Sequence, residues 1–542
     1  METRDEIILD LRRILLLARS CIRFGLFPFA KFVPFAPYRD MSLAVRIRRA
    51  IEGLGLTYLK LGQFLALRYD VVPKEICDQL NQLFESVEPM PFERAKAIIE
   101  AELGAPIEKL YQDFGDTPIA AASVAQVHIA CTTAGEHVAV KVQREGLEPI
   151  FKADIRNMRR IAAVAEKTGV MGRLSARGMI AQFERWTLRE MDFRIEGRTA
   201  ERVQSESEDY VVIPRVYWTL STRRVLTMDF IDGVSVTTAR DLVTTKDRSA
   251  LIRALPDFDL SIALRNLTFA SLSQLFTYGF FHGDPHPGNI FFMPGNRVAF
   301  LDFGIFGELN KEEREGVAAQ IEALALGDLE ASFRFYSKQV AFTDESDYSG
   351  FRRDCLEILG RWYNALSNPN SPIQDRHLSK YTGEMIDVSR RNGLRYDLNY
   401  LLFWRALNNL NGTLWRVDPT FDLAQALREF FNETRAPAIE RVLAVVDDPI
   451  WQESMIRTVT SLPSQLERVL AEKTGNRPRA RIVQVPSRRS RIIHRVEAQS
   501  MTLAVLGLSL AVILVDKTGW VLKAGAAATF AGAALTVGGR RR

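Results

Sequence analysis

The sequence predicts an α+β protein in which a small, β-rich lobe is followed by a larger helical lobe. Three β-rich runs, "SVAQVHIACTT", "EHVAVKVQR" and "RRVLTMDFIDG", lie between residues 123 and 233. From Gly233 to about Asp448 the pattern is helical, except for a short hairpin in "GNIFFMPGNRVAFLDFG". The chain has 542 residues, of which 47% are hydrophobic, so it is long enough for two or more domains with cores of their own.

The first two β-rich runs are joined at Gly135, as in an antiparallel sheet, and a long helical region separates the second from the third. Before them, the pattern from Ser42 to about Phe114 is helical, with breaks at "VVP" and "EPMPF". Residues 1–41 are amphipathic and contain arginines, so they could lie on a membrane or pack on the main domain. The predicted divisions of the chain are 1–41, 42–115, 116–235, 236–448, 449–498 and 499–542.

The last two divisions predict membrane attachment. Ser500 to Val515 carries no charge, and a second apolar run, Ala524 to Gly539, follows after a short polar turn. Each run is slightly shorter than the roughly 20 residues that span a bilayer, and together they predict a transmembrane helical hairpin. Arginine clusters on both outer flanks place both ends in the cytoplasm, and we expect the membrane to be a bacterial inner membrane. The alternative is a hairpin buried in a protein core.

Composition restricts the function classes. Four cysteines lie far apart without CxxC spacing, which argues against a disulfide framework or structural zinc and favours a reducing cytosol. The arginine-rich stretch before the apolar runs is acid-free, and we interpret it as attraction to a membrane surface rather than to nucleic acid.

The candidate chemistry lies in the hairpin of the helical lobe. "FHGDPHPGNIFF" contains Asp284 and Asn289, and "LDFG" contains Asp302. Phosphoryl transfer needs a carboxylate that orients the attacking hydroxyl, and oxygen ligands that hold Mg²⁺ against the phosphates. We expect Asp284 in the first role, and Asn289 and Asp302 in the second, with Lys141 of "VAVK" on the phosphates of ATP or ADP.

Two histidines near Asp284 offer an alternative metal site. His282 and His286 are four residues apart, but the prolines between and after them make a helix unfavourable. We therefore expect a structural role for His282.

Lys141 needs an acidic partner, and Glu190, Asp192 and Glu196 are the candidates. If one helix covers them, Asp192 and Glu196 share a face, while Glu190 lies about 120° away from Glu196. A solvated, charged helix face is the alternative for each of these carboxylates.

A loop that precedes Lys141 has alanines where phosphate-binding loops usually have glycines. Ala120, Ala121, Ala122 and Ser123 form "AAAS". Because each Cβ restricts positive φ, we expect a stiffer loop that adapts less to phosphates. Ordinary packing is the alternative role for these alanines.

Six motifs in order, "KLGQ", "AAAS", "VAVK", "EMD", "HGDPHPGN" and "LDFG", resemble those of the UbiB/AarF family of atypical kinase-like proteins over about residues 45–445. The resemblance implies a two-lobed protein-kinase-like fold whose additional N-terminal helices cover the active site and exclude peptides. It also implies that Lys60 and Gln63 reach the nucleotide site with Glu190 and Asp192 opposite, which leaves Glu196 for Lys141.

The family resemblance implies a membrane-anchored, Mg²⁺-dependent ATPase or unorthodox kinase that supports ubiquinone or other isoprenoid-quinone biosynthesis. It would bind ATP or ADP, and its partners would be membrane lipids, quinone precursors or quinone-biosynthesis enzymes, with a homodimer possible and no nucleic acid. The alternatives are a true kinase of protein or small-molecule hydroxyls, and a nucleotide-gated lipid-binding scaffold without turnover.

Overall fold

A computed structural model describes residues 4–446, with gaps at 27–37, 39, 84–87, 123, 168–174, 245–250, 252, 343–345 and 369. The chain divides into two compact units, Met1–Phe430 and Phe431–Arg542, and nearly all described residues belong to the first. The predicted membrane hairpin at 499–542 and the predicted linker at 449–498 lie outside the described residues. Within the described part of the chain, none of the helices combines the length and hydropathy that a membrane span requires.

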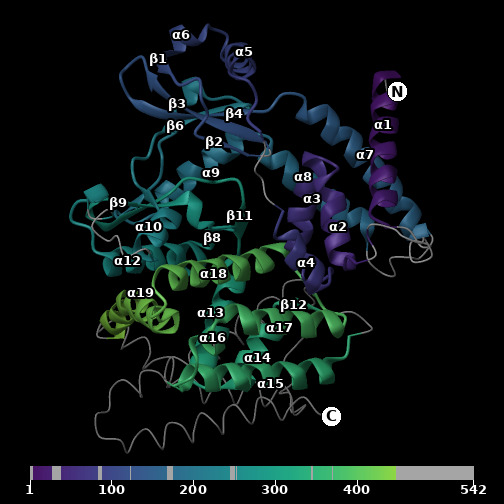
Figure 1. Ribbon diagram of the computed structural model, residues 1–542. Coiled ribbons are helices and arrows are strands. Elements are labelled where there is room, and N and C mark those ends of the chain that lie inside the picture. Colours follow the sequence, from purple (N-terminus) through teal and green to yellow (C-terminus); the bar gives the residue numbers. More distant parts are fainter. Residues whose placement is uncertain are drawn as a thin grey trace, which may run out of the picture. The chain divides into compact units, whose positions relative to one another are not determined.

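The small lobe is built on a five-stranded antiparallel sheet with the order β1-β3-β4-β6, and β2 pairs with β3 (Figure 1). The strands are β1 (Tyr111–Phe114), β2 (Ala120–Ala121), β3 (Ala125–Thr132), β4 (His137–Gln143) and β6 (Val225–Asp229). The three predicted strands and the turn at Gly135, where φ is 85°, are therefore confirmed. The helical prediction was wrong at its C-terminal end, because residues 111–114 pair with β3 as a strand.

Helices cover both faces of this sheet. Val138, Val140 and Val142 alternate along β4 and are fully buried beneath α5 (Phe92–Leu103) and α6 (Ile107–Leu110). The long helical region between β4 and β6 contains α7 (Leu147–Lys167), α8 (Ala176–Glu190) and α9 (Phe193–Ser205). Phe193 of α9 packs with Leu226 on the opposite face. The side chains of β4 that do not face α5 therefore face α9.

The N-terminal extension packs beside α7 and α8. Its helices α2 (Leu43–Glu52), α3 (Leu56–Ala66) and α4 (Lys74–Leu80) share a buried cluster with α7 and α8 that includes Phe64, Phe151 and Phe183. The first helix, α1 (Arg4–Arg23), lies against α7 at the edge of the unit (Figure 1). The predicted alternative of packing on the main domain is thus confirmed for α1.

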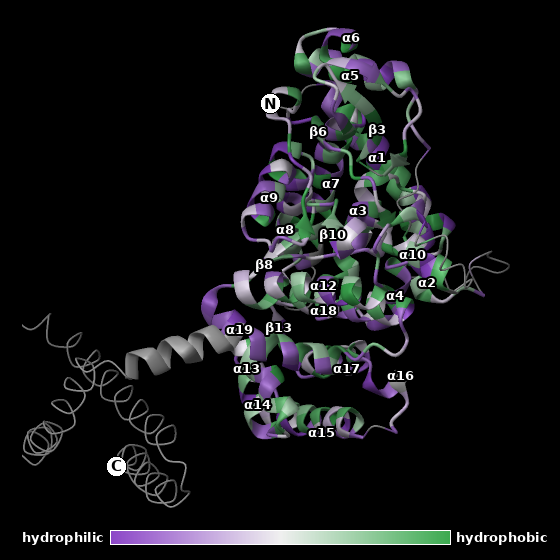
Figure 2. Cartoon of the chain, turned by 90° about the vertical axis from the view of Figure 1, so that its left-hand side faces the viewer, coloured by the Kyte–Doolittle hydropathy of each residue, from purple (hydrophilic) through white to green (hydrophobic). Residues whose placement is uncertain are grey.

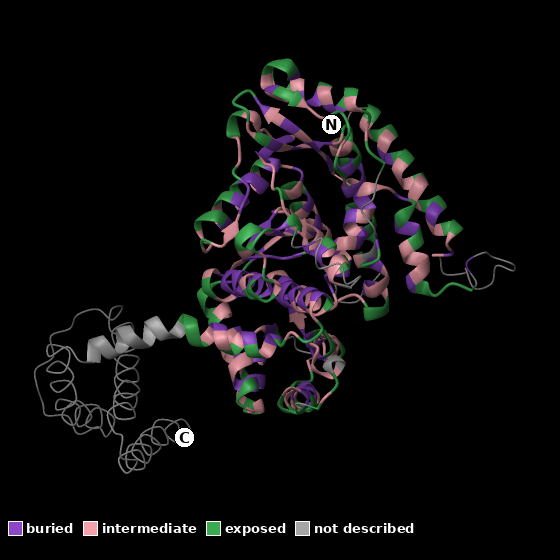
Figure 3. Cartoon of the chain, turned by 60° about the vertical axis from the view of Figure 1, so that its left-hand side comes forward, coloured by how far each residue is buried: buried purple, intermediate pink, exposed green. Residues whose placement is uncertain are grey.

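The large lobe is mainly helical, as predicted. Its helices are α10 (Val236–Thr244), α12 (Leu260–Leu272), α13 (Lys311–Ala325), α14 (Leu329–Ser337), α15 (Tyr348–Ser367), α16 (Ile373–Arg376), α17 (Leu378–Arg391), α18 (Leu398–Val417) and α19 (Leu423–Val446). Hydrophobic residues occur throughout the helices and strands (Figure 2), and the buried ones concentrate in the sheet and the inner helices (Figure 3).

Short strands of the large lobe position the candidate site. The predicted hairpin is confirmed as β9 (Ile290–Met293) and β10 (Arg297–Phe300), with Gly295 and Asn296 at positive φ in its turn. It is extended by β5 (Val211–Val212) and β7 (Val234–Ser235). The remaining pairs are β8 (Phe280–His282) with β11 (Phe306–Glu308), and β12 (Val340–Ala341) with β13 (Arg395–Tyr396). Strands from both sides of the predicted division at residue 235 share the β9–β10 sheet.

Candidate active site

Lys141 is held by a carboxylate of α9. It lies on the face of β4 opposite the buried valines, and its Nζ donates to Glu196 Oε1 at 2.7 Å and Oε2 at 2.9 Å. Burial lowers the pKa of Lys141, but Glu196 and Asp302 outweigh it and leave the pKa raised. Burial, with the charges of Asp302 and Glu190, leaves the pKa of Glu196 raised even though Lys141 lowers it. The structure therefore pairs Lys141 with the partner that we expected.

A second ion pair joins the N-terminal extension to the site. Lys60 of α3 is buried and donates to Glu190 Oε1, at the end of α8. Glu190 Oε2 is buried and accepts no hydrogen bond from the described residues. The charge of Glu190 acts on both Lys141 and Glu196, which places it at the same site. Gln63 is half-buried, one turn further along α3.

Asp192 has a different environment. The three candidate carboxylates do not lie on one helix, the arrangement that we considered from the sequence, because α8 ends at Glu190 and α9 begins at Phe193. Asp192 is the N-cap between them: its Oδ1 accepts from the Arg194 amide at 3.1 Å, and its carboxylate pairs with the Arg194 guanidinium at 2.7 Å. The Arg194 side chain lowers the pKa of Asp192. Asp192 thus fixes the start of the helix that carries Glu196.

The magnesium-binding candidates lie together. Asn289 ends a short 3₁₀ helix, Pro287–Asn289, and its Nδ2 donates to Asp302 Oδ2 at 3.2 Å. Asp302 Oδ1 accepts from the Gly304 amide at 2.9 Å. Burial raises the pKa of Asp302, but Lys141, His282 and this amide counteract it, and the pKa is lowered overall. The carboxyl is therefore ionised at neutral pH. Amide and carboxylate oxygens are ligands that suit Mg²⁺.

The two histidines have structural roles. His282 is buried, stacks on Phe306 with ring centroids 5.2 Å apart, and accepts from the Asp284 amide at Nδ1. Burial lowers its pKa, in agreement with a neutral ring that accepts this bond. His286 caps the Gly288 amide. Across the described residues, no group of three or more His, Cys, Asp or Glu side chains could hold a metal ion.

Asp284 is held by two side chains that the sequence interpretation missed. Arg405 of α18 donates to Asp284 through Nη2–Oδ2 at 2.8 Å and Nε–Oδ1 at 3.3 Å. One turn later, Asn409 donates to Oδ1 at 2.8 Å. Arg405 and Asn409 are polar residues four apart in a helix that is otherwise largely buried and apolar. That spacing was the available signal, since it places both donors on one face.

The alanine loop is part of a tight hairpin. Ala120 and Ala121 form β2 and pair with Val127 and Gln126, and the Ala122 amide donates to Ala125 O at 2.8 Å. None of these three alanines has positive φ. Ser123 lies outside the described residues. The loop therefore uses ordinary extended backbone, where a Cβ is tolerated, rather than the conformations that require glycine.

Comparisons with known proteins give a consistent family assignment. The family described as "ABC1 atypical kinase-like domain" matches residues 82–334. A relative from Arabidopsis thaliana, "Protein ACTIVITY OF BC1 COMPLEX KINASE 7, chloroplastic", is 31% identical over 73% of this chain and 55% of its own length. An uncharacterized protein of Synechocystis is 30% identical, over 71% and 63%. The chain thus spans less than two thirds of these two relatives.

One further sequence relative and one solved structure are also similar to this chain. "Probable protein kinase UbiB" of Marinobacter nauticus is 28% identical, over 73% of this chain and 71% of its own length. A Mycobacterium tuberculosis protein solved with erythromycin is 22% identical and gives a TM-score of 0.48, covering 66% of this chain and 88% of that one. The match to residues 82–334 includes Lys141, Asp284 and Asp302, whereas Lys60 and Arg405 lie outside it.

Proposed function

Because this chain belongs to the ABC1 atypical kinase-like family, we propose that it is a Mg²⁺-dependent ATPase or atypical kinase that acts at a membrane in isoprenoid-quinone biosynthesis. The catalytic part of this proposal rests on one observation: a lysine–glutamate pair, in which the glutamate is buried, lies close to an amide–carboxylate pair. Lys141–Glu196 and Asn289–Asp302 come from different lobes, and the charge of Asp302 acts on Lys141. This arrangement suits the binding of a nucleoside triphosphate together with Mg²⁺.

Each group then has a role in phosphoryl transfer. Lys141, held by Glu196, contacts the nucleotide phosphates, and Asn289 and Asp302 supply oxygen ligands. Bound Mg²⁺ would neutralise phosphate charge. The unmet acceptor at Glu190 Oε2 suits a site that receives a cation or its water shell. Asp284 orients the attacking hydroxyl or water, with Arg405 and Asn409 fixing its carboxylate.

The same site disfavours protein phosphorylation. The Lys60–Glu190 pair ties a helix of the N-terminal extension to the nucleotide site, and we propose that this helix occupies the space where a peptide would bind. The alanine hairpin has no residue at positive φ among Ala120, Ala121 and Ala122, so its amides adapt less to phosphates than those of a glycine loop. Both features favour hydrolysis or a small acceptor.

The lipid pathway and the membrane location rest on other support. The Marinobacter relative carries the UbiB name, and the apolar runs at 500–515 and 524–539 predict a hairpin anchor in a bacterial inner membrane. The proposed partners are membrane lipids, quinone precursors and quinone-biosynthesis enzymes. We also propose that the chain forms a homodimer, which a measurement of its molecular mass in detergent would test.

A nucleotide-gated lipid-binding scaffold without turnover is the second candidate. It is favoured by the contacts of Asp284, whose carboxylate accepts three hydrogen bonds from Arg405 and Asn409. These bonds occupy acceptor positions of the carboxylate, so fewer remain for an attacking hydroxyl or water. On this view, nucleotide binding would switch lipid affinity without phosphate release.

Measuring ATP turnover by the full-length protein in vesicles distinguishes an ATPase, a kinase and a scaffold without turnover. Phosphate release from ATP would be measured with and without Mg²⁺ and with and without a prenylated quinone precursor, alongside phosphate incorporation into protein and lipid. We expect Mg²⁺-dependent release that increases with the precursor and little incorporation into protein. Tight ATP binding without release would favour the scaffold, and efficient incorporation into a protein would favour a true kinase.

A further inference from the structure

Helix α1 presents an apolar stripe away from the other residues that the structure describes. Ile8, Leu11, Leu15 and Ile22 are 38%, 57%, 66% and 65% exposed. They follow one another at helical spacings, so they form a single line along the helix. Scattered exposed leucines are ordinary, but an aligned set on one helix marks a surface that binds something apolar.

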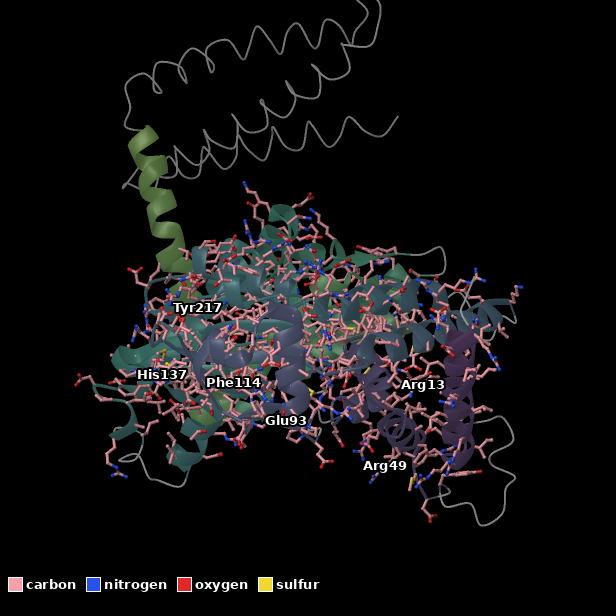
Figure 4. The ribbon with its side chains drawn as sticks, turned by 90° about the horizontal axis from the view of Figure 1, so that it is seen from above. Arg13, Arg49, Glu93, Phe114, His137 and Tyr217 are labelled. Atoms are coloured by element: carbon pink, nitrogen blue, oxygen red, sulfur yellow. The ribbon has the colours of Figure 1, made fainter. Side chains whose placement is uncertain are left out.

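The opposite side of α1 is fixed to the protein by ion pairs and by Leu16 and Leu17, which pack on the hydrophobic cluster of α2, α3, α7 and α8. Arg13 donates to both oxygens of Asp154, each at 2.7 Å, and Figure 4 shows Arg13 on the side of α1 that faces the unit. Asp10 is buried and accepts from Arg156 at 2.6 Å and Arg160 at 2.7 Å, both in α7. Because Leu16 and Leu17 already pack α1 against the protein, the exposed stripe is a second apolar face of this helix. The attachment therefore leaves the apolar stripe available.

Arginines accompany the stripe. Arg4, Arg12, Arg19 and Arg23 are all exposed. In α-helical geometry, Arg12 and Arg19 lie within about 60° of the direction of Leu15. The acids of α1 other than buried Asp10 are confined to its first turn. A partner that contacts the full length of the stripe therefore meets positive charge along one flank.

We propose that α1 docks this stripe on the surface of an anionic lipid bilayer. The aliphatic side chains would enter the boundary between headgroups and acyl chains, and Arg12 and Arg19 would contact lipid phosphates. Charge complementarity favours this occupant, because a second copy of α1 would offer the same arginines and few carboxylates. The contact goes beyond the proposed function, since it involves neither the nucleotide site nor residues 499–542.

A fluorescent probe tests the contact in the full-length chain, even if the C-terminal segment also binds membranes. An environment-sensitive fluorophore is attached at Leu15→Cys, in a background where the half-buried Cys21 and Cys131 are serine. The matched probe is at Leu326→Cys, because Leu326 is 83% exposed outside α1. Vesicles of phosphatidylcholine, with and without phosphatidylglycerol, are then added. We expect a blue shift at position 15 with the anionic vesicles, reduced by salt, and none at position 326.

An exposed charge substitution supplies a second measurement that does not threaten folding. Arg12→Gln with Arg19→Gln should raise the lipid concentration for half-maximal response by about thirtyfold, at roughly 1 kcal/mol per arginine. ATP binding should not change, so failure here is distinguishable from failure of the nucleotide site. The proposal is overturned by an unresponsive probe, or by a response that ignores lipid charge. A probe already blue-shifted without vesicles also overturns it: loss of the shift on dilution would identify a second copy, and persistence another segment of this chain.

Discussion

Arg405→Ala should reduce turnover by removing the guanidinium that orients Asp284. The substitution deletes the bonds Nη2–Oδ2 of 2.8 Å and Nε–Oδ1 of 3.3 Å, and leaves only the 2.8 Å bond from Asn409. A hydrogen bond to a charged group contributes about 1.5–3 kcal/mol. Both side chains are about a quarter exposed, at 27% and 28%, so we take that range for the pair as a whole. Turnover should then fall roughly 10- to 100-fold.

The assay is the initial rate of phosphate release over a range of ATP concentrations, with ATP affinity measured by calorimetry. We expect the loss in kcat, with ATP affinity nearly unchanged, because Arg405 acts on Asp284 rather than on the nucleotide. Arg405→Lys should give an intermediate loss, since it keeps the charge but not the fork of donors. Arg416→Ala is the matched control, because Arg416 is exposed in the last turn of the same helix.

A double-mutant cycle shows whether the effect passes through Asp284. On the Asp284→Asn background, Arg405→Ala should cost little further activity, because the group that it positions is already altered. Fully additive losses would refute the reasoning. So would a folded Arg405→Ala protein with normal turnover, or one with raised turnover, which would make the contact a brake.

Three further predictions concern other parts of the chain. Ala121→Gly should change the ratio of ATP to ADP affinity at a stability cost of roughly 0.5–1 kcal/mol; an unchanged ratio and unchanged autophosphorylation would leave the alanines as packing residues. Burial raises the pKa of Asp10, but the ion pairs with Arg156 and Arg160 counteract it, and the pKa is lowered overall. The ionised Asp10 carboxylate therefore stabilises the folded protein fully above its unfolded pKa of about 3.9. This stabilisation is lost as the pH falls through the lower pKa of the folded state. Hydrogen exchange in α1 should accelerate on that acidification, and equal acceleration in Asp10→Asn would contradict this. Truncation after Ala498 should release a soluble protein that still binds ATP; an insoluble product would favour core helices.

The sheet and the hairpin could be predicted because their signals are local. Valines alternate with other residues along β4, so the sequence shows which face of the strand is buried and that Lys141 lies on the other. In the β9–β10 hairpin, Gly295 and Asn296 supply the positive φ that the turn needs. In contrast, β5 and β7 have only two residues each and exist because they pair with the hairpin. Strands this short leave no periodic pattern in the sequence.

The site was predictable where a motif carries the chemistry and unpredictable where packing does. Spacing alone left three carboxylates open for Lys141, and the resemblance selected Glu196. The break between α8 and α9 was missed because Asp192 was considered as an active-site carboxylate rather than as a helix cap. Arg405 was missed because it is 121 residues from Asp284 in sequence, and only the packing of α18 brings the two together.

The Mg²⁺ dependence of nucleotide binding by Asp302→Asn tests whether this cluster is the nucleotide–metal site. ATP affinity and phosphate release would be measured across a Mg²⁺ titration for wild type, Asp302→Asn and the exposed control Asp113→Asn, after each is shown to fold. Loss of the anionic ligand should abolish the Mg²⁺-dependent part of binding and turnover in Asp302→Asn, while Asp113→Asn behaves as wild type. A folded Asp302→Asn protein with wild-type Mg²⁺ dependence would contradict the assignment of this cluster as the nucleotide–metal site.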